Sequence, residues 1–253
     1  MHIKVIGQGP DLVMLHGWSM HSAVWHDMTE ALAKTFTLHL VDLPGHGQSE
    51  WDENALDLAV LLANLASELP KSAYWLGWSL GGLISTAFAD QFPERVKKLI
   101  LVAATPCFVE KDDWSCAMDP AIFEAFAENL KHDQADTLQR FLLLQARGSV
   151  HSRDTIRQLA DQLAIEKPPV AEALLAGLNL LIATDLRAQL AMLDCPIMMI
   201  LGDRDTLIPD TMLDVVKQMT SNVQTTLLKG AGHAPFISQP KECQQAIELF
   251  INE

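Results

Sequence analysis

The sequence is poor in cysteine, in basic residues and in long apolar segments, and each shortage excludes a class of protein. Four cysteines in 253 residues form no C-x-x-C pair and no Cys/His ligand pattern, so we expect free thiols rather than disulfides or a zinc site. Eighteen basic residues stand against thirty-two acidic ones, a net charge of −14. Such an acidic surface would repel nucleic acid and anionic lipid. No apolar run approaches the roughly 18 residues of a membrane helix.

Signals for export and for nucleotide binding are also missing. The first residues lack the apolar core and cleavage site of a signal peptide, which predicts a cytoplasmic protein. The Gly-x-Gly segments at 7–9 and 45–47 lack the third glycine of a dinucleotide fingerprint, and no P-loop pattern occurs. We therefore expect no cofactor and no metal. Hydrophobic residues make up 49% of the chain and charged ones 20%, which predicts a globular protein with a substantial core.

Short apolar runs alternate with helical patterns along much of the chain. Strands are predicted at 12–16, 37–41, 73–77, 98–103, 196–201 and 225–228, and helices at 25–35, 56–69, 81–91 and from 241 onward. Strands that are apolar on both faces and separated by helices predict an α/β fold, with a mostly parallel sheet between two layers of helices.

The strand pattern stops between the fourth and fifth of these strands. An Asp-Pro pair at 119–120 is typical of a helix start, and further helices are predicted at 135–147 and 153–163, with another opening at 168–169. Unstructured insertions of this length are rare, so a helical cap is the best interpretation. We predict an α/β core formed by residues 1–106 and 186–253, and a cap formed by residues 107–185.

The sharpest motif is the segment GWSLG at positions 77–81, which lies between a predicted strand and a predicted helix. So tight a turn forces its central residue, Ser79, into a strained conformation that exposes the hydroxyl. Glycines on both sides are needed because the backbones approach too closely for a Cβ atom. Ser79 is therefore the predicted nucleophile, with an ordinary Gly-rich turn as the alternative.

A nucleophilic serine requires a base and a group that orients the base. His233 lies in a loop of small residues after the last predicted strand and is the candidate base. Asp203 and Asp205 both follow the preceding strand, and Asp205, deeper in its loop, is preferred. The order Ser, Asp, His is that of α/β-hydrolases. The backbone N–H groups of Trp18 and Leu80 are the expected donors of an oxyanion hole.

Four of the seven arginines cluster in the predicted cap: Arg140, Arg147, Arg153 and Arg157. Spacings of seven and four residues place each pair on one helical face. The stretch that they span carries a net charge of +3, because Asp154 is its only acid. These arginines form either a docking patch for an acidic partner, since guanidinium groups bind carboxylates and phosphates well, or a solvated set of ion pairs within the cap.

Together these features resemble one family, the pimeloyl-[acyl-carrier protein] methyl ester esterases of biotin synthesis. The resemblance spans nearly the whole chain and is carried by segments 15–18, 38–45, 75–83, 140–145 and 233–238. Other α/β-hydrolases share the Gly/Ser/His pattern but lack Trp78 and the cap segment. Asp136, one turn before Arg140, departs from the pattern because the family can place another arginine there.

The resemblance implies hydrolysis of the methyl ester at the far end of a pimeloyl chain carried by acyl carrier protein, with release of methanol. It makes Ser79 the nucleophile, His233 the base and then the acid, and Asp205 the orienting carboxylate. The implied substrate-binding residues are Trp18, Ser79, Leu80, Phe141, Leu142, Leu143, Leu144, Gln145 and His233. Arg140, Arg153 and Arg157, with Arg147 as an addition, would contact the acidic carrier, and the protein would act as a monomer.

Other functions fit the same residues. Carbon–carbon bond hydrolases and thioesterases on this fold use the same triad. A broad-specificity carboxylesterase of short acyl esters would use the same three side chains, with the arginines purely structural. A non-catalytic receptor on the hydrolase scaffold would bind a small molecule under the cap without turnover. Haloalkane dehalogenases and epoxide hydrolases are excluded, because they need a carboxylate where Ser79 stands.

Overall fold

A seven-stranded sheet forms the centre of the computed structural model, which describes residues 1–253. The strand order is β1-β3-β2-β4-β5-β6-β7. The strands are β1 (His2–Gly7), β2 (Asp11–Leu15), β3 (Thr37–Asp42), β4 (Ala73–Trp78), β5 (Val96–Val102), β6 (Ile197–Gly202) and β7 (Val223–Leu228). All neighbouring pairs are parallel except β1 and β3. The predicted α/β class with a mostly parallel sheet is confirmed.

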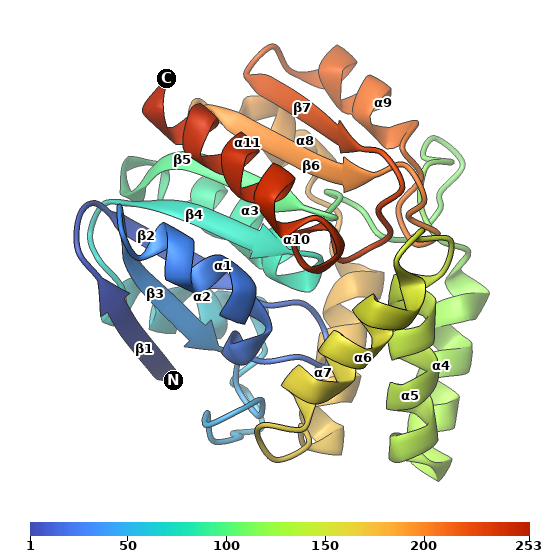
Figure 1. The fold of residues 1–253 in the computed structure, drawn as a ribbon. Coiled ribbons are helices and arrows are strands. Elements are labelled where there is room, and N and C mark those ends of the chain that lie inside the picture. The colour runs from blue at the N-terminus through green and yellow to red at the C-terminus, as the bar shows by residue number, and fades with distance from the viewer.

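Helices cover both faces of the sheet (Figure 1). One face carries α1 (His26–Leu32) and α11 (Pro240–Asn252), and the other carries α2 (Leu58–Glu68), α3 (Leu80–Gln91) and α8 (Arg187–Met192). The remaining core elements are α9 (Met212–Met219), α10 (Pro235–Ser238), η1 (Ser22–Trp25) and η2 (Pro93–Arg95). Helix α3 is almost wholly buried, which is why its apolar residues show no single helical stripe in the sequence.

Four helices gather beyond the ends of the parallel strands (Figure 1). They are α4 (Pro120–His132), α5 (Gln134–Ala146), α6 (Ser152–Leu163) and α7 (Ala171–Ala183). Asp119 begins α4 as expected, because its side chain accepts a hydrogen bond from the N–H of Ala121. The chain enters and leaves this block at one place, where the Leu186 N–H donates to the Pro106 oxygen at 2.8 Å. We therefore propose that residues 107–185 be treated as a cap on a core of residues 1–106 and 186–253.

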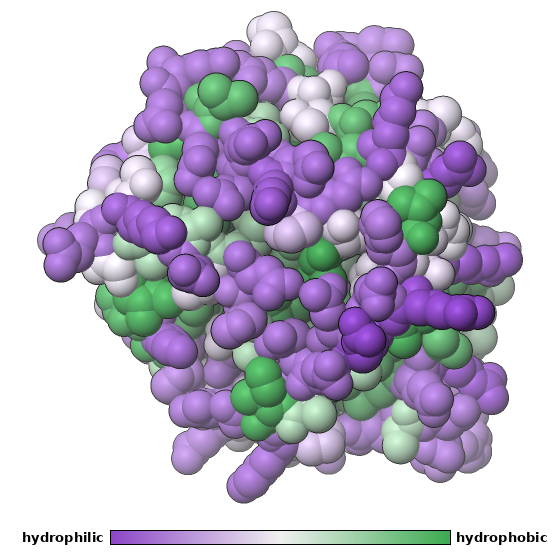
Figure 2. All heavy atoms as spheres, viewed as in Figure 1, coloured by the Kyte–Doolittle hydropathy of each residue, from purple (hydrophilic) through white to green (hydrophobic).

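The surface in the same view is covered mainly by hydrophilic side chains, with hydrophobic residues scattered in small groups (Figure 2). None of the helices combines the length and the apolar character that crossing a bilayer would require. The apolar residues are instead concentrated in the central strands, and β6 is buried along its whole length. This buried sheet is the rigid support for the loops that follow β2, β4, β6 and β7.

Candidate active site

Ser79 occupies a strained turn between β4 and α3. Its backbone φ of 53° and ψ of −116° lie in a region that residues other than glycine rarely adopt. Gly77 and Gly81 make the turn possible. A Cβ at position 77 would overlap the carbonyl oxygen of Gly81, and a Cβ at position 81 would overlap that of Leu15. The turn therefore fixes the Ser79 hydroxyl at the carboxyl end of the sheet.

The structure brings Ser79, His233 and Asp205 into one chain of hydrogen bonds. His233 Nε2 lies 3.0 Å from Ser79 Oγ, and His233 Nδ1 lies 2.8 Å from Asp205 Oδ2. His233 comes from the loop between β7 and α10, and Asp205 from the loop after β6. The side chains of His233 and Asp205 are 1% and 0% exposed. In this geometry the carboxylate accepts a hydrogen bond from Nδ1–H, and Nε2 can accept the serine proton.

The two carboxylates after β6 have different partners. Asp205 Oδ1 accepts hydrogen bonds from the N–H groups of Leu207 and Ile208, at 2.8 and 3.1 Å, which leaves Oδ2 for His233. Asp203 Oδ1 instead accepts the N–H of Gly230 at 2.6 Å. Asp203 therefore ties the loop after β6 to the loop of His233, and only Asp205 meets the imidazole.

The backbone N–H groups of Trp18 and Leu80 have no hydrogen-bond partner within the protein. Leu80 is the first residue of α3, where free N–H groups and the helix dipole favour a negative charge. Trp18 is fixed by its side chain, whose Nε1–H donates to the oxygen of Leu174 in α7 at 2.8 Å. Its ring also packs edge-on against Phe141 at 4.7 Å. The two N–H groups therefore remain available to a ligand oxygen.

A buried polar cluster supports the loop that carries Trp18. His16 Nε2 accepts the N–H of Leu43 at 3.0 Å, and His16 Nδ1 donates to the oxygen of Gly17 at 2.8 Å. Burial lowers the pKa of His16 to about 3 and that of His46 to about 4, so both imidazoles are neutral near pH 7. Sequence patterns give no sign of this cluster, because its members come from separate loops.

A small apolar cavity of about 20 Å³ adjoins Ser79 and His233. Its walls include Phe123 and Phe126 from α4 and Phe141 from α5. A cavity of this volume holds about one water molecule. An acyl chain could enter only if aromatic side chains of the cap move aside.

Of residues 141–145, which we expect from the sequence to line one acyl tunnel, only Phe141 lies at the cavity beside Ser79. Leu143 is 49% exposed, and Leu142 lines a different groove. The reason is geometric: successive residues of a helix point about 100° apart, so five consecutive side chains cannot share one face. Leu144 is half-buried and lines neither space. Gln145 is buried, and its backbone oxygen accepts the N–H of His233 at 2.9 Å.

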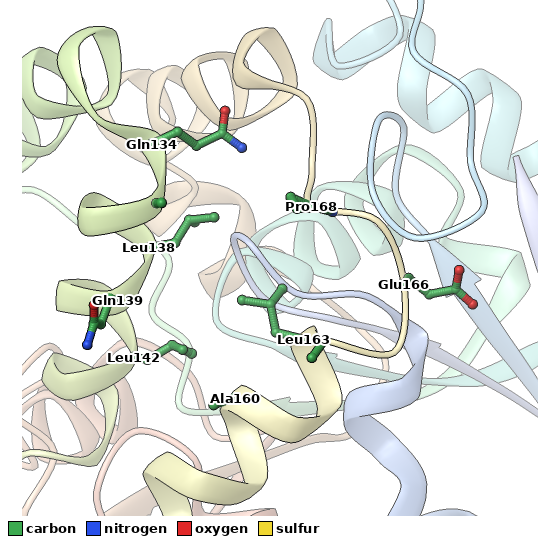
Figure 3. A pocket seen from close by; sticks show the side chains of 10 residues that line it. Gln134, Leu138, Gln139, Leu142, Ala160, Leu163, Glu166 and Pro168 are labelled. Carbon is green, nitrogen blue, oxygen red and sulfur yellow. The ribbon is translucent and has the colours of Figure 1, made fainter.

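The groove that Leu142 lines is larger, about 660 Å³, and lies between α5 and α6 (Figure 3). Leu138 and Leu163 face it from the two helices, and Glu166 is its one ionisable residue. It contains no nucleophile, no imidazole and no paired carboxylates. Chemistry rather than size therefore identifies the cavity at Ser79 as the candidate active site.

The four cap arginines are all exposed, and two have acidic neighbours. Arg140 Nε lies 2.7 Å from Asp136 Oδ2, and Arg157 Nη2 lies 3.0 Å from Asp154 Oδ1. Arg147 and Arg153 form no ion pair. Exposed pairs of this kind contribute little free energy, so they would not prevent the guanidinium groups from meeting another partner.

Known proteins resemble this chain in sequence and in fold. The α/β hydrolase fold family matches residues 10–240. Pimeloyl-[acyl-carrier protein] methyl ester esterases from Aeromonas hydrophila and Stenotrophomonas maltophilia are each 42% identical to the chain. The match to the Aeromonas hydrophila esterase covers 98% of both chains. The match to the Stenotrophomonas maltophilia esterase covers 99% of this chain and 96% of that one.

Among solved structures, an esterase from Exiguobacterium antarcticum has a TM-score of 0.87 at 20% sequence identity. The alignment covers 100% of this chain and 95% of the esterase. A bromoperoxidase from Bacillus anthracis has a TM-score of 0.88 at 21% sequence identity, and the alignment covers 99% of this chain and 95% of the bromoperoxidase. These two likenesses concern the fold alone. On the sequence matches, the chain belongs to the α/β hydrolase fold family and, within it, to the pimeloyl-[acyl-carrier protein] methyl ester esterases.

Proposed function

We propose that this protein is a serine carboxylesterase that hydrolyses the methyl ester of pimeloyl-acyl carrier protein, releasing methanol and a free carboxylate in biotin synthesis. The observation that carries the proposal is the chain of hydrogen bonds from Ser79 through His233 to Asp205. It occurs in a sequence 42% identical over nearly its full length to esterases of that name.

In the first half of the reaction, His233 Nε2 takes the hydroxyl proton as Ser79 Oγ attacks the ester carbonyl carbon. The tetrahedral oxyanion is stabilised by the N–H groups of Trp18 and Leu80, which have no other partner. Asp205 stabilises the imidazolium through Nδ1–H. The intermediate then expels methoxide, which takes the proton from His233 and leaves as methanol.

In the second half, water attacks the acyl-enzyme that remains on Ser79. His233 removes a proton from the water and returns it to Ser79 Oγ as the ester bond to the enzyme breaks. The product is the carboxylate, with the rest of the chain still attached to the carrier. Each step uses only groups of the protein and water, so the proposal invokes no metal and no organic cofactor.

The surroundings of Ser79 suit an apolar chain that ends in an ester. The cavity walls are mainly aromatic and aliphatic, which favours a methylene chain over a polar one. Access from the cap side would also bring the carrier close to Arg140, Arg153 and Arg157. Without such a local positive patch, a protein of net charge −14 would repel an acidic carrier.

The test compares hydrolysis of methyl pimeloyl-acyl carrier protein with that of free dimethyl pimelate, at low and moderate salt. It uses the wild type and a triple variant, Arg140→Ala, Arg153→Ala and Arg157→Ala. We expect the triple variant to lose kcat/KM by about 10-fold or more on the carrier-bound ester only, and we expect salt to slow the wild type on that substrate.

A matched control replaces three exposed lysines of the core, Lys34, Lys71 and Lys241, by alanine, which changes the net charge equally. This control should retain the wild-type preference. If wild type and arginine variant treat both esters alike, the arginines are structural and the protein is a broad-specificity carboxylesterase. A protein that fails to react with a fluorophosphonate would instead be a non-catalytic receptor. We further propose that the protein is monomeric and cytoplasmic.

A further inference from the structure

Trp78 precedes Ser79 in the chain, and its indole ring reaches the loop that carries His233. The residue is 1% exposed. Its Nε1–H donates a hydrogen bond of 2.8 Å to the main-chain oxygen of His233, 155 positions away in the sequence. The ring also packs edge-on against Phe236 at 5.0 Å. Trp78 therefore holds the backbone of His233 from the side of the sheet.

The main-chain N–H of His233 is held from the side of the cap. It donates to the oxygen of Gln145, in the last turn of α5, at 2.9 Å. The N–H of Val150, in the turn between α5 and α6, donates to the oxygen of Gly230 at 3.0 Å. The two main-chain polar groups of His233 are thus engaged by opposite sides, one by the core and one by the cap.

The same indole ring also meets the loop of the proposed oxyanion donor. A Cβ at Gly17 would lie 3.0 Å from Cε3 of Trp78, so the glycine next to Trp18 packs directly on the ring. One buried side chain therefore touches the loop of a proposed oxyanion donor and the loop of the proposed base. Neither loop can shift without displacing it.

Trp75, three residues earlier in β4, shows that a buried indole in this strand does not always find a partner. It is 0% exposed and stacks on Phe88 at 4.0 Å, yet its Nε1 forms no hydrogen bond. The two buried tryptophans thus differ in whether the indole N–H forms a hydrogen bond. Only the indole N–H of Trp78 engages the main chain of His233.

We propose that Trp78 is a positioning residue, which together with the turn between α5 and α6 fixes His233 for proton transfer. The inference rests on the proposed function, since it concerns the base of that reaction. Trp78 does not line the cavity at Ser79, so it acts through His233 rather than on the substrate. Loss of its hydrogen bond lets the imidazole drift from Ser79 Oγ, and small misplacements of a reacting group slow catalysis strongly.

The test replaces Trp78 and Trp75 separately by phenylalanine and measures kcat and KM on p-nitrophenyl acetate, with thermal unfolding of each variant. Both changes remove the same atoms from a buried site in β4. We expect W78F to lower kcat by about 10- to 100-fold with little change in KM, and to slow fluorophosphonate labelling in parallel. W75F should keep nearly the wild-type kcat. Equal kcat values in the two variants would overturn the proposal.

A second pair of variants acts on the same loop from the cap. Val150→Pro removes the N–H that binds Gly230, whereas Val150→Ala keeps it and shortens a side chain that is 68% exposed. We expect only V150P to lower kcat, and wild-type kcat in a folded V150P would overturn the role of the turn.

A wild-type protein inert to esters and to fluorophosphonate would contradict the proposed function itself, whereas equal rates in W78F and W75F contradict this inference alone.

Discussion

At the scale of single residues, the candidate site combines the three side chains of the proposed triad with several that only support them. His16 and His46 belong to the second group: both are fully withdrawn from solvent, and each donates from Nδ1 to a carbonyl oxygen of its own loop. Burial keeps them neutral, and the loop of Trp18 depends on that neutrality. The stability of the fold should therefore depend on pH in a window set by these imidazoles.

The expected direction follows from proton counting. Burial lowers the pKa of His16 from 6.5 to about 3 and that of His46 from 6.5 to about 4. The unfolded chain therefore binds more protons below pH 6.5, and stability falls as the pH falls from 6.5 towards 4. At pH 5 each histidine should lower the free energy of unfolding by about 2 kcal/mol relative to pH 7.

Urea unfolding at pH 7 and pH 5 measures this difference, and a His46→Asn variant should show a pH dependence smaller by about 2 kcal/mol. Equal free energies of unfolding for the wild type at the two pH values would contradict the assignment of neutral, buried imidazoles.

At the scale of elements, the turn between β4 and α3 is the feature on which the site depends most. Gly81 lies against the carbonyl oxygens of Leu15 and His16, with no room for a Cβ atom. We expect Gly81→Ala to push α3 away from β2, to lower the free energy of unfolding by about 1–3 kcal/mol, and to lower kcat because Ser79 and the Leu80 N–H move together. Chemical denaturation and ester hydrolysis measure the two effects, and a fully stable, fully active G81A would contradict this account of the turn.

Elements with a purely local signal could be predicted from the sequence, and those that depend on tertiary context could not. Strands β2, β4 and β6 are buried on both faces and so read as apolar runs. Strand β1 lacks such an apolar run, because it is an edge strand, half-exposed and antiparallel to β3. Helices α8 and α9 are too short to show a clear helical period in the sequence.

The candidate site likewise contains residues that a local sequence pattern predicts and residues whose placement depends on tertiary contacts. Ser79 is predictable because the turn around it needs glycines at fixed spacing, and this constraint is local. The direction of each side chain in 141–145 depends on the phase of α5, which packing against α4 and α6 determines. The hydrogen bond from Trp78 to His233 joins residues 155 positions apart, and no local sequence pattern indicates a contact between residues so far apart.

At the scale of the whole molecule, charge distribution and cap position are linked. The molecule has a net charge of −14, whereas α5 and α6 carry exposed arginines, and α5 also supplies Phe141 to the wall of the cavity at Ser79. Fields from exposed charges are screened over about 10 Å at 0.1 M salt. An acidic carrier at the cap therefore interacts mainly with the local patch, and added salt weakens this attraction, which is why we expect salt to slow the wild type on the carrier-bound ester.

The most direct test of the central claim is the intact mass of methyl pimeloyl-acyl carrier protein after incubation with wild type or Ser79→Ala. The account predicts that the wild type makes the carrier lighter by one CH₂ unit, with an equal amount of methanol released and the acyl chain still attached. Ser79→Ala should leave the mass unchanged. Release of the whole acyl chain by thioester cleavage, or equal conversion by Ser79→Ala, would contradict the account.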